Sequence, residues 1–445
     1  MNLDASPAIP CDTLVTASGI LTQNARREVI RDGAVAISGG RIAAVGSRAE
    51  LATAYAPAET LAMGQALVLP GLVNAHAHAA MTLFRGLADD LPIADWLHNH
   101  IWPVERLLTP EAVHLGALAA CAEMLACGTT CFADLYFFAD QTARAADTLG
   151  MRAVVGEGVL DFPTPSAKTP AEALDISRAL FDHLRSHPRL SAMVVAHSPY
   201  AASDATLAAC AALAREQDAV FTLHAAEGVT ENADSLKKTG KRVIPHLHSL
   251  GILGKNCLLA HCVHVDDTDL DLLAATGTNV AHCPRSNAKL ASGTAPIPAM
   301  LQRGLAVALG TDGAASNNAL NLFAEMGFAS LGHKLASGDP TSFPARAALD
   351  AATLGGAACL GLPDIGAIVP GHHADLAVLS LTRPSMVPFF DAPSQLVYAA
   401  SGAEVVLTMV AGRVVYRDGR FPNLDAAALF REVRDMAASL AAKRP

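Results

Sequence analysis

The 445-residue sequence has few aromatic residues, no excess of basic charge and no long apolar run, and each shortage removes a class of protein. Aromatic residues make up 5% of the chain, so Ala, Leu and Val must fill its core. The formal charge of −10 offers neither a basic patch for nucleic acid nor a polybasic surface for anionic lipid. A membrane-spanning run of about 18 apolar residues is also missing. We therefore expect neither nucleic acid nor membrane as a partner.

The nine cysteines are an odd number and contain no Cys-x-x-Cys pair, which argues against a disulfide framework or a cysteine-based zinc site. They are typical of buried free thiols in a reducing compartment. Residues 1–13 contain no Lys or Arg and no apolar run of signal-peptide length. These features predict a cytoplasmic protein.

A repeated pattern of an apolar run followed by a helix-like stretch dominates the middle of the chain. Helical spacing covers 112–126, 171–186, 203–217 and 266–276, with capping residues at Thr109, Thr169 and Ser203. Alternation of this kind predicts an α/β fold, a (β/α)8 TIM barrel. A doubly wound open sheet is the alternative, disfavoured because no Gly-rich phosphate loop follows the first run. The eight apolar runs are 66–78, 129–136, 152–160, 191–200, 220–227, 257–265, 278–284 and 306–313.

Short β-like runs occupy both ends of the chain, at 14–16, 33–38 and 41–45 and again at 374–379, 405–410 and 412–416. They predict one small β-sandwich assembled from both termini. We expect residues 1–66 and 368–423 to form this sandwich, 67–367 the barrel, and 424–445 a closing helix.

Histidines and an aspartate stand where the predicted strands end. His76 and His78 are two residues apart on a strand, so both side chains point to the same side. Because barrel active sites lie at the carboxyl ends of the strands, we expect these residues to converge. Imidazoles and a carboxylate that meet at one point are typical of a metal site. The other strand-end residues are His197, His224, His261 and Asp312.

Five motifs make the chain similar to a known group of enzymes. The sequence resembles the amidohydrolase superfamily, and within it the methylthioadenosine / S-adenosylhomocysteine deaminase branch, over essentially its whole length. The motifs are Pro-Gly-Leu-Val-Asn-Ala-His-Ala-His (70–78), Leu-His-Ala-Ala-Glu (223–227), Leu-Ala-His-Cys-Val-His (259–264), His-Cys-Pro-Arg-Ser-Asn (282–287) and Gly-Thr-Asp-Gly-Ala-Ala-Ser-Asn-Asn (310–318).

The resemblance implies a role for each site residue. Glu227 would be the proton shuttle, His261 would lie beside the attacking water, and Asp312 would accept a proton from that water. Glu105, His197 and Glu227 would contact substrate. The metal ligands would be His76, His78, His224 and Asp312.

Three further residues have open interpretations. Trp102 either lines the pocket or anchors a loop, and Ser286 and Asn287 either bind substrate or form a turn. The branch also places substrate arginines between the third and fourth strands, whereas residues 161–170 contain none and Arg152 begins the third strand. The chain therefore departs from the branch in the segment that is expected to determine its preference for nucleoside substrates.

The implied cofactor is one divalent metal, with Zn²⁺ first and Fe²⁺ or Mn²⁺ as alternatives. A second metal would need a bridging lysine, and Lys168 is the only lysine between the second and fifth predicted strands. The implied function is hydrolytic deamination of 5′-methylthioadenosine, S-adenosylhomocysteine or adenosine. The alternatives are a deaminase or chlorohydrolase of guanine, a pterin or an s-triazine, or a non-catalytic metal-binding relic. We also expect a homo-oligomer with a small heterocyclic substrate.

Overall fold

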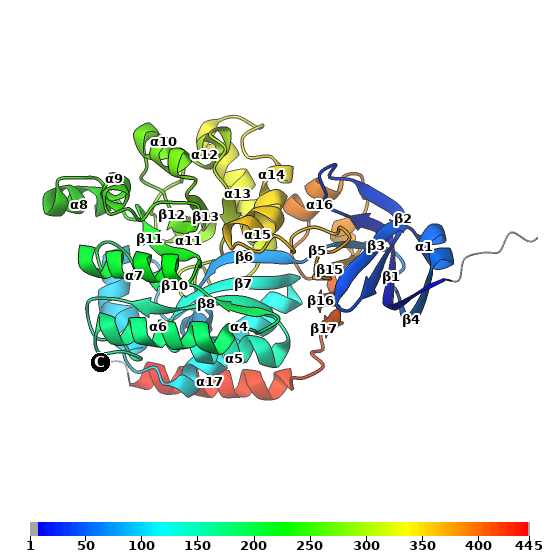
Figure 1. Cartoon of the computed structure of the whole chain (residues 1–445), viewed down its shortest axis with the longest axis horizontal. Helices are drawn as coiled ribbons and strands as arrows, with labels where there is room; N and C mark the ends of the chain where they lie inside the picture. Colours follow the sequence, from blue (N-terminus) through cyan, green and yellow to red (C-terminus); the bar gives the residue numbers. More distant parts are fainter. Residues whose placement is uncertain (1–7, 444–445) are drawn as a thin grey trace, which may run out of the picture.

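A computed structural model describes residues 8–443 as a large α/β body and a smaller β body arranged along the long axis (Figure 1). Residues 1–7 and 444–445 of the expected terminal segments lie outside this range. Among the described residues, no helix combines the length and apolarity needed to cross a membrane.

The large body confirms the predicted barrel. Its eight main strands are paired in parallel, in the order in which they occur along the chain. The first and last strands approach each other where Asp312 N donates to His76 O at 3.0 Å, so the ring is nearly closed. The strands are β6 (Leu72–Ala77), β7 (Thr129–Tyr136), β8 (Arg152–Val159), β10 (Val194–Ala196), β11 (Phe221–Ala225), β12 (Cys257–His261), β13 (Asn279–His282) and β14 (Val307–Leu309).

Two of the predicted strands are divided in the structure. The run 66–78 was expected as one strand, but it breaks at Gly71 into β5 (Ala66–Pro70), which pairs in the terminal sheet, and β6 in the barrel. The run 191–200 is interrupted at Met193, between β9 (Leu190–Ala192) and β10. Both errors have one cause: the residues on each side of the break are apolar and largely buried, so hydropathy does not mark it.

Helices surround the barrel, and the four predicted ones are confirmed. The side chains of Thr109, Thr169 and Ser203 each accept a hydrogen bond from a backbone N–H of the first helical turn, as their positions indicated. The principal helices are α4 (Pro110–Ala126), α5 (Ala139–Leu149), α6 (Pro170–Leu184), α7 (Asp204–Glu216), α9 (Val243–Ser249), α10 (Asp267–Thr276), α12 (Ile297–Gln302) and α13 (Leu322–Ser337).

Shorter helices lie in the connections. Those that follow β6 are η1 (Ala79–Phe84), α2 (Ile93–Asp95), η2 (Trp96–Ile101) and α3 (Trp102–Glu105). The others are α8 (Glu231–Thr239), α11 (Pro284–Lys289), α14 (Ala345–Asp350), η3 (Ala351–Gly355) and α15 (Gly356–Cys359).

Both ends of the chain build the small body, as predicted. Its strands follow the order β17-β16-β15-β5-β1-β2-β3, with β4 paired to β1. Apolar residues of the N-terminal and C-terminal strands share one core cluster, so the sheet closes over a common interior. The elements are β1 (Ile9–Leu21), β2 (Val29–Ser38), β3 (Arg41–Ser47), α1 (Arg48–Ala54), β4 (Tyr55–Ala62), β15 (Leu376–Ser380), η4 (Pro384–Met386), α16 (Ala392–Tyr398), β16 (Val405–Val410) and β17 (Arg413–Arg417).

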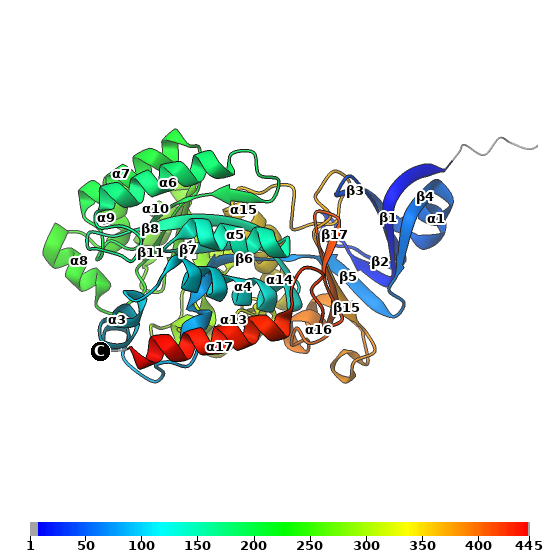
Figure 2. The same ribbon diagram turned by 90° about the horizontal axis from the view of Figure 1, so that it is seen from below.

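The last helix, α17 (Ala426–Ala442), returns to the barrel and runs beside α4 (Figure 2). Leu429 and Leu440 are its buried residues. A second link between the bodies is the buried ion pair of Arg152 Nε with Asp375 Oδ2, at 2.8 Å. The barrel is therefore clamped to the terminal body at the end opposite the strand-end histidines.

Candidate active site

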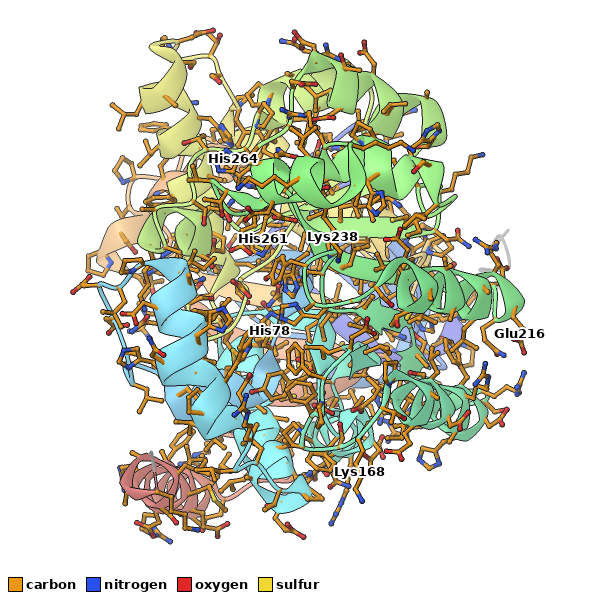
Figure 3. All side chains as sticks on the ribbon, turned by 90° about the vertical axis from the view of Figure 1, so that its left-hand side faces the viewer. His78, Lys168, Glu216, Lys238, His261 and His264 are labelled. Atoms are coloured by element: carbon orange, nitrogen blue, oxygen red, sulfur yellow. The ribbon has the colours of Figure 1, made fainter. Side chains whose placement is uncertain are left out.

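The predicted site residues meet at the carboxyl ends of the barrel strands. Figure 3 views the molecule from the side away from the small body, with His78 and His261 labelled near the centre. Several residues at or just after the strand ends have positive φ without being glycine, among them Ala226 (53°), His261 (74°) and Asp312 (60°). Such backbone is costly for side chains with a Cβ and persists where the surrounding fold enforces it, often at functional sites.

The four predicted ligands bring their donor atoms together. His78 Nε2 lies 3.1 Å from Asp312 Oδ1 and 3.3 Å from His224 Nε2, and His76 Nε2 lies 3.6 Å from the same carboxylate oxygen. Two nitrogens bound to one tetrahedral zinc at about 2.05 Å would be about 3.4 Å apart. The donor spacing therefore fits a single ion of this size.

The hydrogen bonds of these imidazoles also call for a cation. His78 Nδ1 lies 2.6 Å from Leu135 O, and His224 Nδ1 lies 2.6 Å from His197 O. Because a carbonyl can only accept, each Nδ1 carries the proton, and a neutral ring then leaves Nε2 as a lone pair. Two lone pairs 3.3 Å apart repel unless a metal ion, or a proton on one of the two rings, lies between them. Within residues 8–443, neither ring nitrogen of the buried His76 has a hydrogen-bond partner.

The proposed proton shuttle lies beside this cluster. Glu227 is buried, with Oε2 at 3.8 Å from His261 Nε2. Burial raises the pKa of the Glu227 carboxyl, against the opposing effect of His261. His261 in turn has Nδ1 2.8 Å from Asn287 Oδ1, and it forms a second donor group with His76 and His224. A carboxyl group that holds its proton more tightly is suited to act as an acid.

Ser286 and Asn287 were expected to contact substrate or form a turn, and the structure places them behind the site. Both are fully buried on α11. Ser286 Oγ donates to Asp312 Oδ2 at 2.6 Å, and the Asn287 amide oxygen accepts from His261. Neither is among the residues that line the pocket next to Glu105. Their side-chain contacts are with Asp312 and His261 rather than with that pocket.

Three of the other predicted substrate residues line the pocket next to the donor cluster, whereas Glu227 lines a neighbouring cavity. The three are Glu105, His197 and Trp102, which line the pocket together with His78 and His224. Burial raises the pKa of Glu105, although Tyr136 opposes this by donating from its hydroxyl to Glu105 Oε1 at 2.7 Å. Trp102 thus lines the pocket and also packs against Phe162, with ring centroids 5.4 Å apart.

Sequence reasoning missed Tyr136, Asp134 and Ser316. Tyr136 closes β7 and could have been found by the strand-end rule that found the histidines. Asp134 Oδ1 accepts from Ala79 N at 2.6 Å, which fixes the turn after the ligand strand. Ser316 Oγ donates to Asp312 Oδ2 at 2.7 Å, and the only signal for it was its position four residues after the ligand.

Lys168 is an exposed residue near the lower edge of the view in Figure 3, away from His78 and His261. It is therefore not placed to bridge a second metal ion.

A parallel barrel whose strand ends gather three imidazoles and a carboxylate beside a buried glutamic acid defines a metal-dependent TIM-barrel hydrolase. The chain belongs to the amidohydrolase family, whose model matches residues 67–415. A shorter match, to an imidazolonepropionase-like composite domain of bacteria, covers residues 33–58 in the small body.

Relatives of known name cover nearly the whole chain. A 5-methylthioadenosine/S-adenosylhomocysteine deaminase from Nitratidesulfovibrio vulgaris (strain DSM 19637 / Miyazaki F) is 51% identical over 427 residues, which are 96% of this chain and 97% of that protein. The structure of an adenosine deaminase from Xanthomonas campestris with bound zinc is 39% identical, with a TM-score of 0.96 over 98% of this chain and 100% of that one. A guanine deaminase from E. coli, at 24% identity and a TM-score of 0.82 over 91% and 99% of the chains, shares the fold.

Proposed function

We propose that this protein is a hydrolytic deaminase that releases ammonia from a purine nucleoside thioether. The candidate substrates are 5′-methylthioadenosine and S-adenosylhomocysteine, with adenosine as a third. The observation that carries this proposal is the buried Glu227 carboxyl 3.8 Å from His261, next to the four-donor cluster. A protein that only bound metal would not need an acid held in that position. The name of the 51% identical relative supports the choice of substrate.

The proposed cofactor is one divalent ion held by His76, His78, His224 and Asp312. Zinc is favoured by the donor spacing and by the zinc of the Xanthomonas structure, and Fe²⁺ and Mn²⁺ are the alternatives for this donor set. When bound, such an ion makes a water molecule a nucleophile at neutral pH by lowering its pKa to about 7.

The protein groups around the ion manage the protons of the reaction. Asp312 accepts the proton of the attacking water, and Glu227 donates its proton to the ring nitrogen beside the amino-bearing carbon. His261 orients the water and stabilises the charge that develops as the water adds. Glu227, now a carboxylate, takes the proton of the added hydroxyl group and passes it to the amino group, which leaves as ammonia. One water is consumed, a ring carbonyl remains, and the proton held by Asp312 restores the Glu227 acid for the next turnover.

The proposed substrate contacts follow the pocket lining. In this proposal Glu105 accepts hydrogen bonds from ribose hydroxyls, His197 contacts the purine, and Trp102 covers it. For Ser286 and Asn287 we propose a positioning role, since each bonds to a catalytic side chain. The carboxyl of Glu227 serves both as substrate contact and as shuttle.

Three broader properties complete the proposal. A cytoplasmic location is supported by the nine free cysteines, eight of them buried. A homo-oligomer is supported by apolar side chains exposed on α13, where Phe328, Leu331 and Leu335 are 43%, 58% and 87% exposed. For the domain boundary we propose Gly71 rather than 66/67, because β5 pairs within the terminal sheet.

The test is ammonia release from a panel of adenosine derivatives, guanine, pterins and amino- or chloro-s-triazines, with metal analysis of the same sample. Turnover of an adenosine thioether by protein with one bound ion per chain is the expected result. Turnover of only guanine, a pterin or a triazine would refute the nucleoside substrate, but the proposed catalytic site would stand. Metal-loaded protein inactive on the whole panel would favour a non-catalytic metal-binding protein.

A further inference from the structure

The pocket beside Glu105 has mainly apolar walls. They come from the segment after β6 and from the segment after β8, which meet where Trp102 contacts Phe162. Thioether sulfur and methylene groups pack well against such surfaces. The apolar lining includes Leu97, Trp102, Phe137, Leu160, Phe162 and Pro163.

Among the described residues that line this pocket, Arg106 is the only lysine or arginine. It follows Glu105 at the end of α3. Its side chain is exposed, and its guanidinium has no hydrogen bond or ion pair with the residues that the structure describes. Other arginines near the barrel are paired: Arg85 with Glu123, and Arg152 with Asp375. The Arg106 guanidinium therefore keeps its donors available to a ligand.

Other cations lie elsewhere. Residues 161–170 contribute Phe162, Pro163, Thr164 and Pro165 to the lining, and Lys168 in that segment is not part of it. Lys238 lines a different cavity, on the side of Glu227 and Tyr200. An anionic group that enters beside Glu105 thus has the Arg106 guanidinium as its basic partner in the lining of this pocket.

We propose that Arg106 is the specificity-determining residue that binds a carboxylate at the far end of a nucleoside 5′ substituent. This inference rests on the proposed function. With the ribose at Glu105, the 5′ thioether chain runs along the apolar wall and its carboxylate reaches the guanidinium, whose paired N–H donors suit a carboxylate. S-Adenosylhomocysteine carries that carboxylate, whereas 5′-methylthioadenosine ends in a methyl group.

The experiment compares kcat/KM for S-adenosylhomocysteine, 5′-methylthioadenosine and 5′-butylthioadenosine, using metal-loaded wild type, Arg106→Gln and Arg106→Lys. Arg178→Gln, on an exposed i,i+3 pair of α6, is the matched control. In Arg106→Gln we expect a loss of about tenfold for S-adenosylhomocysteine, the size of one charge-assisted hydrogen bond, through KM. The two uncharged thioethers should stay within about twofold of wild type, since neither carries the charge that the guanidinium binds. Arg106→Lys should retain part of the preference.

Two results would overturn the assignment. An equal loss of kcat/KM for all three nucleosides in Arg106→Gln would mean that the residue supports α3 and Glu105 rather than binding the carboxylate. An unchanged kcat/KM for S-adenosylhomocysteine would mean that the guanidinium faces only solvent. Wild-type protein that is inactive on every nucleoside would refute the proposed function and, with it, the role of Arg106. That outcome is distinct from the two results above, which both require an active wild-type enzyme.

Discussion

Replacing Glu227 by Gln removes one titratable proton from the site and almost nothing else. The amide has nearly the shape of the carboxyl group and can still donate a hydrogen bond, but it cannot release and recover a proton. Glu231, the nearest acid along the chain, accepts from Glu227 N at 2.8 Å, so it is engaged on the backbone side. Glu105 belongs to the pocket bordered by Tyr136. Glu231 Oε1 has no partner among the described residues, but the carboxylate paired with His261 is that of Glu227, so we expect no full substitute for it as the shuttle.

General acid–base groups contribute about 10²–10⁴-fold to turnover, and without a substitute we expect a loss of about 10³–10⁴-fold, or about 4–5.5 kcal/mol. The four ligands are untouched, so metal content and thermal stability should match wild type. The assay is ammonia release under saturating substrate, with metal content measured on the same protein. Glu157→Gln, another buried glutamate that does not line the pocket, is the matched control. Near-normal turnover by Glu227→Gln would refute the assignment of the shuttle.

Three other predictions concern the metal, its support and the stability of the barrel. Removing the ion with a chelator should abolish ammonia release, and adding back Zn²⁺, Fe²⁺ or Mn²⁺ should restore it and rank the ions; full turnover by verified metal-free protein would exclude the site. Ser286→Ala, which removes one of the two hydroxyl donors to Asp312 Oδ2, should lower metal affinity or kcat by about 10–100-fold, measured by metal competition and steady-state kinetics. Burial raises the pKa of Glu157 to about 7, above its ordinary 4.5, so its contribution to folding is full below pH 4.5 and is lost as pH rises through 7. Glu157→Gln should remove up to about 3 kcal/mol of the stability difference between pH 4.5 and 8 in urea unfolding, and an unchanged pH dependence would contradict that.

The barrel strands were predictable where a continuous apolar run ends at a polar residue. β7 spans the predicted residues, Thr129–Tyr136, and β8 ends one residue early. The first strand was wrong because its break depends on tertiary contact. A Cβ on Gly71 would lie 2.0 Å from Thr130 Oγ1, so glycine is needed where the chain passes from the small body to the barrel. Pro70-Gly71 marks a turn, but apolar residues on both sides concealed it.

The convergence of the proposed metal ligands was predictable for a different reason. In a parallel barrel the carboxyl ends of all strands lie on one face. Residues at strand ends, such as His76, His224 and Asp312, were therefore expected to face one centre. The sequence does not indicate which residues lie behind that centre and contact the site residues rather than the substrate. Ser286 and Asn287 follow the seventh strand just as a substrate contact would, and only the fold of α11 turns them toward Asp312 and His261.

The residues proposed for catalysis and those proposed for substrate specificity are likewise held by different parts of the fold. Two of the three proposed ligand imidazoles, His78 and His224, are oriented by backbone carbonyls of the barrel at Leu135 and His197, so their geometry does not depend on the segments that cover the pocket. Those segments contact each other through Trp102 and Phe162. Phe162→Ala should therefore raise KM for a 5′-thioether by about tenfold, the value of an apolar contact of one or two kcal/mol, while metal content and kcat stay near wild type. Loss of metal in that variant would show that the covering loop also supports the ligands, and the separation of the two roles would then be wrong.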